Sequence, residues 1–249
     1  MRTETFTTPG AVTLQINVPA GDVDIETRES AETVVELEVR GRDSEELERE
    51  TRIEARPRVD GHEVVVDAAQ VRRLLRIRGG DYRVRIQAPP GAAVRAELAT
   101  ADIRGRGRYG ELELDVASGD VEFDQVDGEA KVNTASGDVE LRRVASARLN
   151  SASGDIRVVE AAGSLEVNTA SGDVQIRKVV EGNVKAHSAS GDIEVGIAKG
   201  SRLWVDAQSL SGDTSSELEL EPAPVPDDEG PLVELRAQTM SGDISVRRA

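Results

Sequence analysis

The sequence predicts an all-β fold, a single-stranded parallel β-helix (β-solenoid) with about 17–19 residues per coil. Three observations favour it. The tripeptide Ser-Gly-Asp recurs seven times, apolar residues alternate with polar ones on both sides of each copy, and aromatic residues make up only 2% of the chain. A core of Val, Ile, Leu and Ala with one Trp suits thin layers of β-branched side chains better than a large globule.

The first five copies of the repeat recur at a nearly constant spacing, and the last two are farther apart. Successive Asp residues lie 18, 17, 18, 19, 21 and 30 positions apart, and a degenerate copy ends at Asp102. The seven copies are Ser118, Gly119, Asp120; Ser136, Gly137, Asp138; Ser153, Gly154, Asp155; Ser171, Gly172, Asp173; Ser190, Gly191, Asp192; Ser211, Gly212, Asp213; and Ser241, Gly242, Asp243.

Period-two alternation predicts a half-buried strand on each side of the tripeptide. The residues one and three positions after Asp are apolar, as in Ile156 and Val158, and so are those eight and six positions before it, as in Leu165 and Val167. The residue three positions before Asp is expected to point inward at a tight corner; this column is Ala99, Ala117, Ala135, Ala152, Ala170, Ala189, Leu210 and Met240.

A unit of about 18 residues is too short for a strand-helix repeat, but it fits one coil of a solenoid. Each strand is then expected to pair in parallel with its copy one turn away, at a spacing of about 4.8 Å. The 30-residue gap contains an acidic, Pro-rich stretch, 221–231, which predicts a surface loop that leaves the stack and returns.

The expected domains are an irregular β-rich part or cap over 1–92, with incomplete coils, and regular coils over 93–249. Within the first part a hairpin is predicted near 51–68, and Asp43-Ser-Glu-Glu46 could open a short helix through a capping box. At the other end, Arg247 and Arg248 are expected to place charge on the last strand of the stack.

Stacked coils would set the Asp residues in a ladder, in which neighbouring carboxylates repel by about 0.9 kcal/mol even in water-like dielectric. The structural interpretation is that each carboxylate accepts hydrogen bonds from the backbone N–H groups of its own corner and from Ser hydroxyls, while Gly supplies a positive φ. The alternative is Ca²⁺ neutralisation, with Asp120, Asp138, Asp155, Asp173 and Asp192 as candidate ligands. Asn133, Asn150 and Asn168 predict a second, amide ladder.

Composition argues against several functions. A formal charge of −16 disfavours nucleic acid and anionic membrane surfaces, and the absence of Cys removes thiol chemistry. No catalytic residues, cofactor or membrane insertion are predicted: the chain has only two histidines, His62 in an expected turn and His187 in the Asn column. A carbohydrate-active β-helix is disfavoured because Phe123 and Trp204 are expected to point inward.

The units "TASGDV" and "SASGDI", the opening "VPAGDVDIE" and the terminal "TMSGDISV" resemble the DUF4097 family of bacterial adhesin-like proteins, which is related to DUF2807. The similarity covers roughly residues 10–248. It implies a parallel β-helix, right-handed in such proteins, and a bacterial source, and it implies no catalytic residues. The adhesin label rests on the analogy between β-helices and surface proteins.

The leading hypothesis is therefore a non-enzymatic protein-interaction or scaffold module whose partner is another protein. The alternatives are a Ca²⁺-responsive β-roll-like module, a polymer-forming bactofilin-like scaffold and, last, a carbohydrate-active enzyme. A monomer is expected, with self-assembly as the other option. Because no signal peptide or membrane span is seen in the sequence, a cytoplasmic location is expected.

Overall fold

The computed structural model describes residues 1–41, 43–68, 80–216 and 230–249. The chain divides into two compact units, Met1–Gly128 with Val132–Thr134 and Glu129–Lys131 with Ala135–Ala249. Strand β8 (Val121–Ser136) contributes residues to both units. The boundary at residue 92 stays a prediction about where the regular repeat begins. Of the loop at 221–231, all but Gly230 and Pro231 lies outside the described residues.

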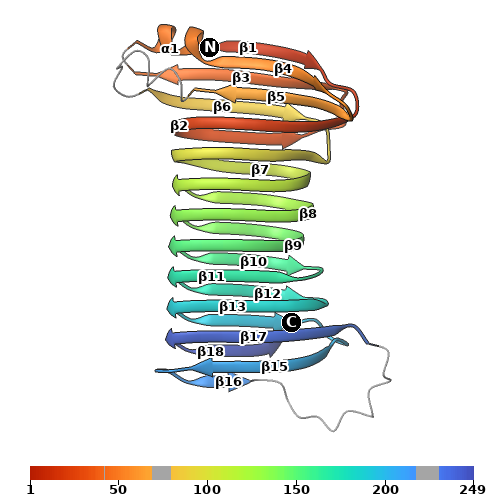
Figure 1. Cartoon of the computed structure of the whole chain (residues 1–249), viewed down its shortest axis with the longest axis vertical. Coiled ribbons are helices and arrows are strands. Elements are labelled where there is room, and N and C mark those ends of the chain that lie inside the picture. The colour runs from red at the N-terminus through yellow and green to blue at the C-terminus, as the bar shows by residue number, and fades with distance from the viewer. Residues whose placement is uncertain (42, 69–79, 217–229) are drawn as a thin grey trace. The chain divides into compact units, whose positions relative to one another are not determined.

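The first unit is built around one long strand, β2, which runs along two faces of a coil. Its first part pairs in parallel with β5 and with the start of β7, and its second part pairs in parallel with β6 and with the next part of β7 (Figure 1). The elements of this unit are β1 Arg2–Thr7, β2 Ala11–Thr27, β3 Glu32–Arg40, α1 Ser44–Glu50, β4 Arg52–Arg58, β5 Gly61–Asp67, β6 Asp81–Ala88 and β7 Ala92–Ser118.

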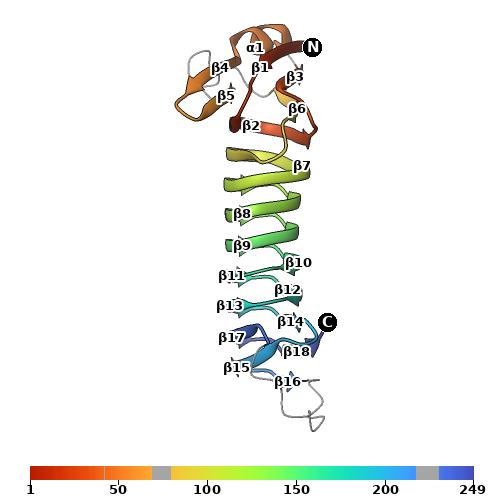
Figure 2. The same cartoon turned by 90° about the vertical axis from the view of Figure 1, so that its right-hand side faces the viewer.

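Beyond β5 and β6 the pairing in this unit changes from parallel to antiparallel. Strand β4 pairs antiparallel with β5 around residues 59 and 60, and β3 pairs antiparallel with both β6 and β1. Helix α1 packs on β3 and buries Leu47 (Figure 2). The capping box predicted for α1 is wrong: Asp43 takes a left-handed conformation, and its side chain makes no capping hydrogen bond.

The second unit is a stack of two-faced coils. One face holds, in spatial order, the end of β9, then β11, β13, β17 and β15; the other holds the start of β9, then β10, β12, β14, β18 and β16. Every one of these pairs is parallel. The strands are β9 Val139–Ser153, β10 Ile156–Ala161, β11 Leu165–Ser171, β12 Val174–Val179, β13 Gly182–Ser190, β14 Ile193–Ile197, β15 Arg202–Ser209, β16 Thr214–Ser216, β17 Leu232–Ser241 and β18 Ile244–Arg248.

The coils of this unit do not follow one another in sequence order. The last coil of the chain, β17 and β18, lies between the coil of β13 and β14 and the coil of β15 and β16 (Figures 1 and 2). The prediction that Arg247 and Arg248 charge the last strand of the stack is therefore wrong, because β18 pairs on both sides. Among the described residues of this unit, the terminal coil of the stack is instead formed by 202–216.

The alternating columns confirm the predicted strand faces. Ile156, Val158, Leu165 and Val167 are buried, as are their counterparts in the neighbouring coils. The Ala column, however, is exposed, which corrects the expectation that it points inward. Alternation continues for one more step past Val167, so that the residue four positions before Asp, Thr169 in this coil, is the buried one and the next residue faces out.

Two aromatic side chains meet in the core of the first unit. Tyr109 and Phe123 are fully buried and meet edge to face, with ring centroids 5.0 Å apart. The Tyr109 hydroxyl donates to the carbonyl oxygen of Ile25 at 2.8 Å, which satisfies a polar group inside an apolar layer. Burial raises the pKa of Tyr109, so this hydroxyl keeps the proton that it donates.

The Gly of the repeat is predicted to be irreplaceable because two coils touch there. Gly172 has φ +135°, and an added Cβ would lie 2.2 Å from the carbonyl oxygen of Gly154 in the adjacent coil. Gly200 also has a positive φ, +85°, but open space around it. We expect Gly172→Ala to lower the free energy of unfolding by about 3 kcal/mol or more, and Gly200→Ala by about 1 kcal/mol, in denaturant titrations followed by circular dichroism. Equal losses in the two variants would contradict a clash between coils.

Candidate functional site: the Asp corner and a charged hollow

The Ser-Gly-Asp corner joins neighbouring coils through three kinds of hydrogen bond. The Gly N–H donates to the Ser carbonyl oxygen of the next coil, as Gly154 does to Ser171 at 3.1 Å. The N–H of the residue after Asp donates to the Asp carbonyl oxygen of the next coil, as Ile156 does to Asp173 at 2.9 Å. Between these two, the N–H of Asp173 itself points back and donates to Oδ1 of Asp155 at 2.9 Å.

The Asp side chain thus takes the place of a backbone carbonyl at the point where the chain turns. In the second unit the same bond joins Asp155 to Asp138, Asp173 to Asp155, Asp192 to Asp173, Asp243 to Asp192 and Asp213 to Asp243, with N–O distances of 2.8–2.9 Å. In the first unit Asp120 donates in the same way to Asp102, at 3.0 Å. The spatial order of the ladder is the order of the coils rather than that of the sequence.

The hydrogen-bond partner differs from the expected one. Asp155 and Asp173 accept from the Asp N–H of the adjacent coil, whereas the sequence predicts donors in their own corner and in Ser hydroxyls. A carboxylate that bonds across the gap between coils stabilises the stack itself, because its donor is otherwise an unpaired N–H at a bend.

Sequence reasoning missed another column at the corner, a Ser or Thr hydroxyl four positions before Asp, which is buried in Ser188 and Thr239 and half-buried in Ser209. Ser188 donates to the carbonyl oxygen of Gly172 at 3.5 Å, Thr239 to that of Gly191 at 3.2 Å, and Ser209 to that of Gly242 at 2.9 Å. Each donor reaches the Gly of the preceding coil in the stack. The recurrence of Ser or Thr at one fixed offset from Asp was the signal that could have identified it.

The amide column also bonds along the stack. Nδ2 of Asn168 donates to Oδ1 of Asn150 at 3.0 Å in the second unit, and Nδ2 of Asn133 donates to Oδ1 of Asp115 at 2.9 Å in the first. His187 continues the column between Asn168 and Gln238. His62 lies in β5 opposite Pro57, not in a turn as expected.

The corner supplies one carboxylate per coil, whereas a Ca²⁺ site needs six to eight oxygen ligands. Within residues 1–41, 43–68, 80–216 and 230–249, no group of three or more His, Asp or Glu side chains could hold a metal ion. In the same part of the chain, no helix combines the length and apolar character that crossing a membrane requires.

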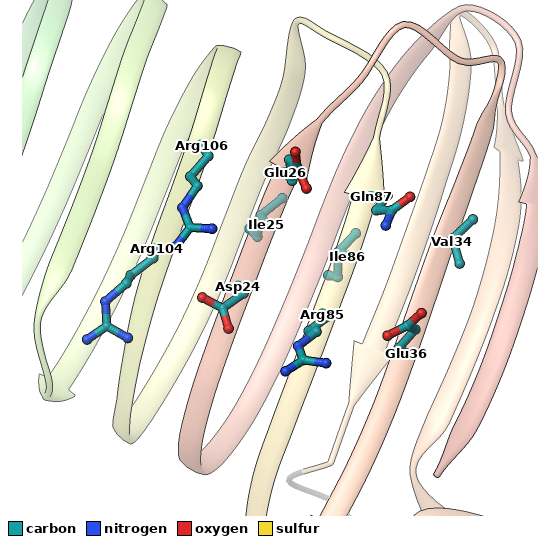
Figure 3. A pocket seen from close by; sticks show the side chains of 10 residues that line it. All are labelled: Asp24, Ile25, Glu26, Val34, Glu36, Arg85, Ile86, Gln87, Arg104 and Arg106. Carbon is teal, nitrogen blue, oxygen red and sulfur yellow. The ribbon is translucent and has the colours of Figure 1, made fainter.

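A different arrangement, a charged hollow, lies on the outward face of four strands of the first unit. Its volume is about 370 Å³, and Figure 3 shows its side chains rising from β7, β2, β6 and β3 in turn. The strand register sets them in two rows, Arg104, Asp24, Arg85 and Glu36 in one and Arg106, Glu26, Gln87 and Val34 in the other, above the buried Ile25 and Ile86.

Charge alternates along the first of these rows. Asp24 stands between Arg104 and Arg85, and Arg85 stands between Asp24 and Glu36. The hollow therefore carries three Arg and three carboxylates on a chain whose formal charge is −16. Cross-strand neighbours of opposite charge stabilise one another by a modest amount and keep the capacity to bond to a partner.

A second hollow, of about 400 Å³, lies on β9, β11 and β13 of the second unit. Arg148, Glu166 and Lys185 line it side by side on these three strands, and Arg148 pairs with Glu166 at 3.2 Å. It has no comparable alternation over four strands, so it serves below as the matched control surface.

Comparison with known proteins supports the fold. The family model described as Toastrack DUF4097 matches residues 96–247, more than half of the chain. A candidate adhesin from Bacteroides fragilis has a similar solved structure, with a TM-score of 0.55 and 13% identity over 98% of this chain and 96% of that one. A candidate adhesin from Parabacteroides distasonis is similar with a TM-score of 0.50 and 10% identity, again over 98% and 96%. No curated protein matches the chain.

We predict that removal of one ladder carboxylate weakens the stack locally. Asp155→Ala leaves the N–H of Asp173 without its acceptor, and because the site is exposed to water we expect a loss of about 1 kcal/mol in the free energy of unfolding. Asp155→Asn keeps an oxygen acceptor and should lose less. Denaturant titrations of the two variants check this; a larger loss for Asn than for Ala would contradict the role as an acceptor.

We also predict that the ladder does not depend on calcium. Five ladder carboxylates, those of Asp138, Asp155, Asp173, Asp192 and Asp243, each already accept a backbone N–H. Ca²⁺ at millimolar concentration should therefore leave the melting temperature unchanged, as should chelator. Differential scanning calorimetry of the full chain with each addition decides the matter. A melting temperature that rises by several degrees with Ca²⁺ but not with Mg²⁺ would contradict this prediction and support the calcium hypothesis.

Proposed function

Because the chain belongs to the DUF4097 (Toastrack) family, we propose that it is a non-enzymatic protein-interaction module that binds a partner protein on the charged hollow of its first unit. The adhesin names of the similar structures agree with a binding role, although at 10–13% identity those structures support the fold alone. The observation that carries the proposal is the alternating row Arg104, Asp24, Arg85 and Glu36.

The hollow is suited to a partner because the strands that carry its side chains are held in register before binding. These side chains stand on four paired strands rather than on loops, and in the row Arg104, Asp24, Arg85 and Glu36 the register places each residue beside one of opposite charge. Ion pairs at the rim, such as Arg104 with Asp102 at 3.2 Å, reduce the freedom that binding would otherwise have to remove.

The electrostatics of the hollow indicate the chemistry of the partner. The chain as a whole repels acidic proteins, but here three guanidinium groups face outward together with three carboxylates. A partner segment that presents both signs of charge, with its own Asp or Glu opposite Arg85 and Arg106, would be complementary to this surface. Such complementarity fixes register and orientation more than raw affinity.

The test combines crosslinking with charge reversal. A photo-crosslinking amino acid placed at Arg85 in the full chain, expressed in the native host, should capture a defined partner, and the same probe at Lys185 on the control hollow should not. Arg85→Glu should then weaken binding of the identified partner about tenfold or more, while Arg148→Glu leaves it unchanged. Melting curves verify that both variants are folded.

Two outcomes would contradict the proposal. One is that neither probe position yields an adduct above background; the other is that Arg85→Glu and Arg148→Glu affect binding equally. The cytoplasmic location expected from the sequence stays a prediction, which fractionation of the same host cells tests.

A further inference from the structure

The terminal coil of the second unit lies where exposed large hydrophobic side chains are concentrated. Strands β15 and β16 form it, and five of the seven exposed large hydrophobic side chains among the described residues lie on it or on its neighbour β17. These are Trp204, Val205 and Leu210 on the terminal coil, and Leu232 and Met240 on the next one. Trp204, expected from the sequence to point inward, is 47% exposed and packs against the guanidinium of Arg236, with the guanidinium carbon 5.6 Å from the ring centroid.

The inward-facing side chain of Val205, in the terminal coil, is incompletely covered. In register it stands beside Leu235 of β17, which is fully buried, yet Val205 itself is 39% exposed. The inward column of the stack thus ends at Val205 with nothing from the described residues above it. Within those residues β15 pairs with β17 alone, so its other edge presents backbone N–H and C=O groups.

The direction of these backbone groups can be derived from the flanking bonds. The N–H of Arg202 donates to Pro231 and that of Leu210 to Thr239, both toward the β17 side. Even-numbered residues of β15 therefore bond inward. Because successive residues of a strand point their N–H and C=O groups to opposite sides, Leu203, Val205 and Ala207 direct theirs to the open edge.

We propose that this edge pairs with the same edge of a second copy of the chain, antiparallel and about a two-fold axis at Trp204. In that register Leu203 and Val205 of one copy form backbone hydrogen bonds with Val205 and Leu203 of the other, and the two Trp204 side chains meet on the outer face. Arg202 lies opposite Asp206 of the second copy, and Asp206 opposite its Arg202.

This register makes the edge complementary to itself. In both charge pairs an Arg lies opposite an Asp. The pairs occupy non-hydrogen-bonded positions of the antiparallel ladder, where side chains approach most closely. The apolar column of each copy continues into that of the other, which covers Val205. An isologous contact of this kind closes after two copies, so it produces a dimer and no filament.

The inference goes beyond the proposed function and rests on a different unit of the chain, so either can fail without the other. Sedimentation velocity of the full chain from about 1 μM to 500 μM, near 0.15 M salt, should show a concentration-dependent monomer–dimer equilibrium. Trp204 is the only Trp, so its fluorescence should shift to shorter wavelength over the same concentration range.

A charge swap tests the register itself. Arg202→Asp and Asp206→Arg each place like charges opposite one another across the axis and should weaken dimerisation about tenfold or more, whereas the double variant restores opposite signs and should recover most of it. Arg177→Asp, an exposed change of the same charge on the inner strand β12, is the control and should dimerise as the unmodified chain does.

Three outcomes would overturn the inference: a monomer at every concentration, growth beyond a dimer, or single variants that dimerise like the unmodified chain. Because Arg202 also donates to the carbonyl oxygen of Gly230, its substitution could disturb the fold. Val205→Lys, which charges the open edge without touching that bond, should likewise abolish the dimer, and circular dichroism verifies that each variant is folded.

Discussion

The repeat depends on one hydrogen bond, that between the carboxylate of an Asp in one coil and the backbone N–H of the Asp in the next. At the corner the chain leaves one strand and enters another, and Gly with its positive φ makes that change of direction without a side chain between the coils. The change interrupts the regular alternation of backbone donors and acceptors. The Asp side chain restores it, so that the corner pairs as continuously as the strands beside it.

This bond also accounts for an arrangement that would otherwise be unfavourable. Carboxylates stacked about 4.8 Å apart repel one another, by about 0.9 kcal/mol for each neighbouring pair in water-like dielectric. A charge-assisted bond to a backbone N–H contributes on the order of 1.5–3 kcal/mol where water competes little, and less at an exposed corner. The balance favours the ladder while each carboxylate has its own donor, as Asp155 and Asp173 do.

Much of the fold could be predicted because burial in a strand follows a period of two. Ile156, Val158, Leu165 and Val167 lie where the alternation places them, and the family similarity agrees. The corner was harder: whether Ala170 or Thr169 faces inward depends on how far the alternation continues before Gly172 turns the chain. The apolar character of Ala170 suggested that it faces inward, but the alternation of the strand places Thr169 there.

The order of the coils could not have been predicted from the repeat. All coils present the same bonding edges, so nothing in a Ser-Gly-Asp unit specifies its neighbour, and the coil of Asp243 lies between those of Asp192 and Asp213. The exposure of Trp204 has another cause: it stands beside Glu234 in the outward-facing row of β15 and β17, whereas the next residue, Val205, faces inward beside the buried Leu235. The charged hollow was also missed, since its rows bring together residues of β2, β3, β6 and β7 that are distant in sequence.

The most direct test of the central bond is amide hydrogen exchange, measured residue by residue in the unmodified chain. The backbone N–H groups of Asp155, Asp173 and Asp192 lie at exposed corners, yet each donates to a carboxylate of the adjacent coil. They should exchange far more slowly than amides in exposed turns, and nearly as slowly as those of the flanking strands. Exchange at the rate of an unstructured peptide would show that the carboxylates do not hold the coils together.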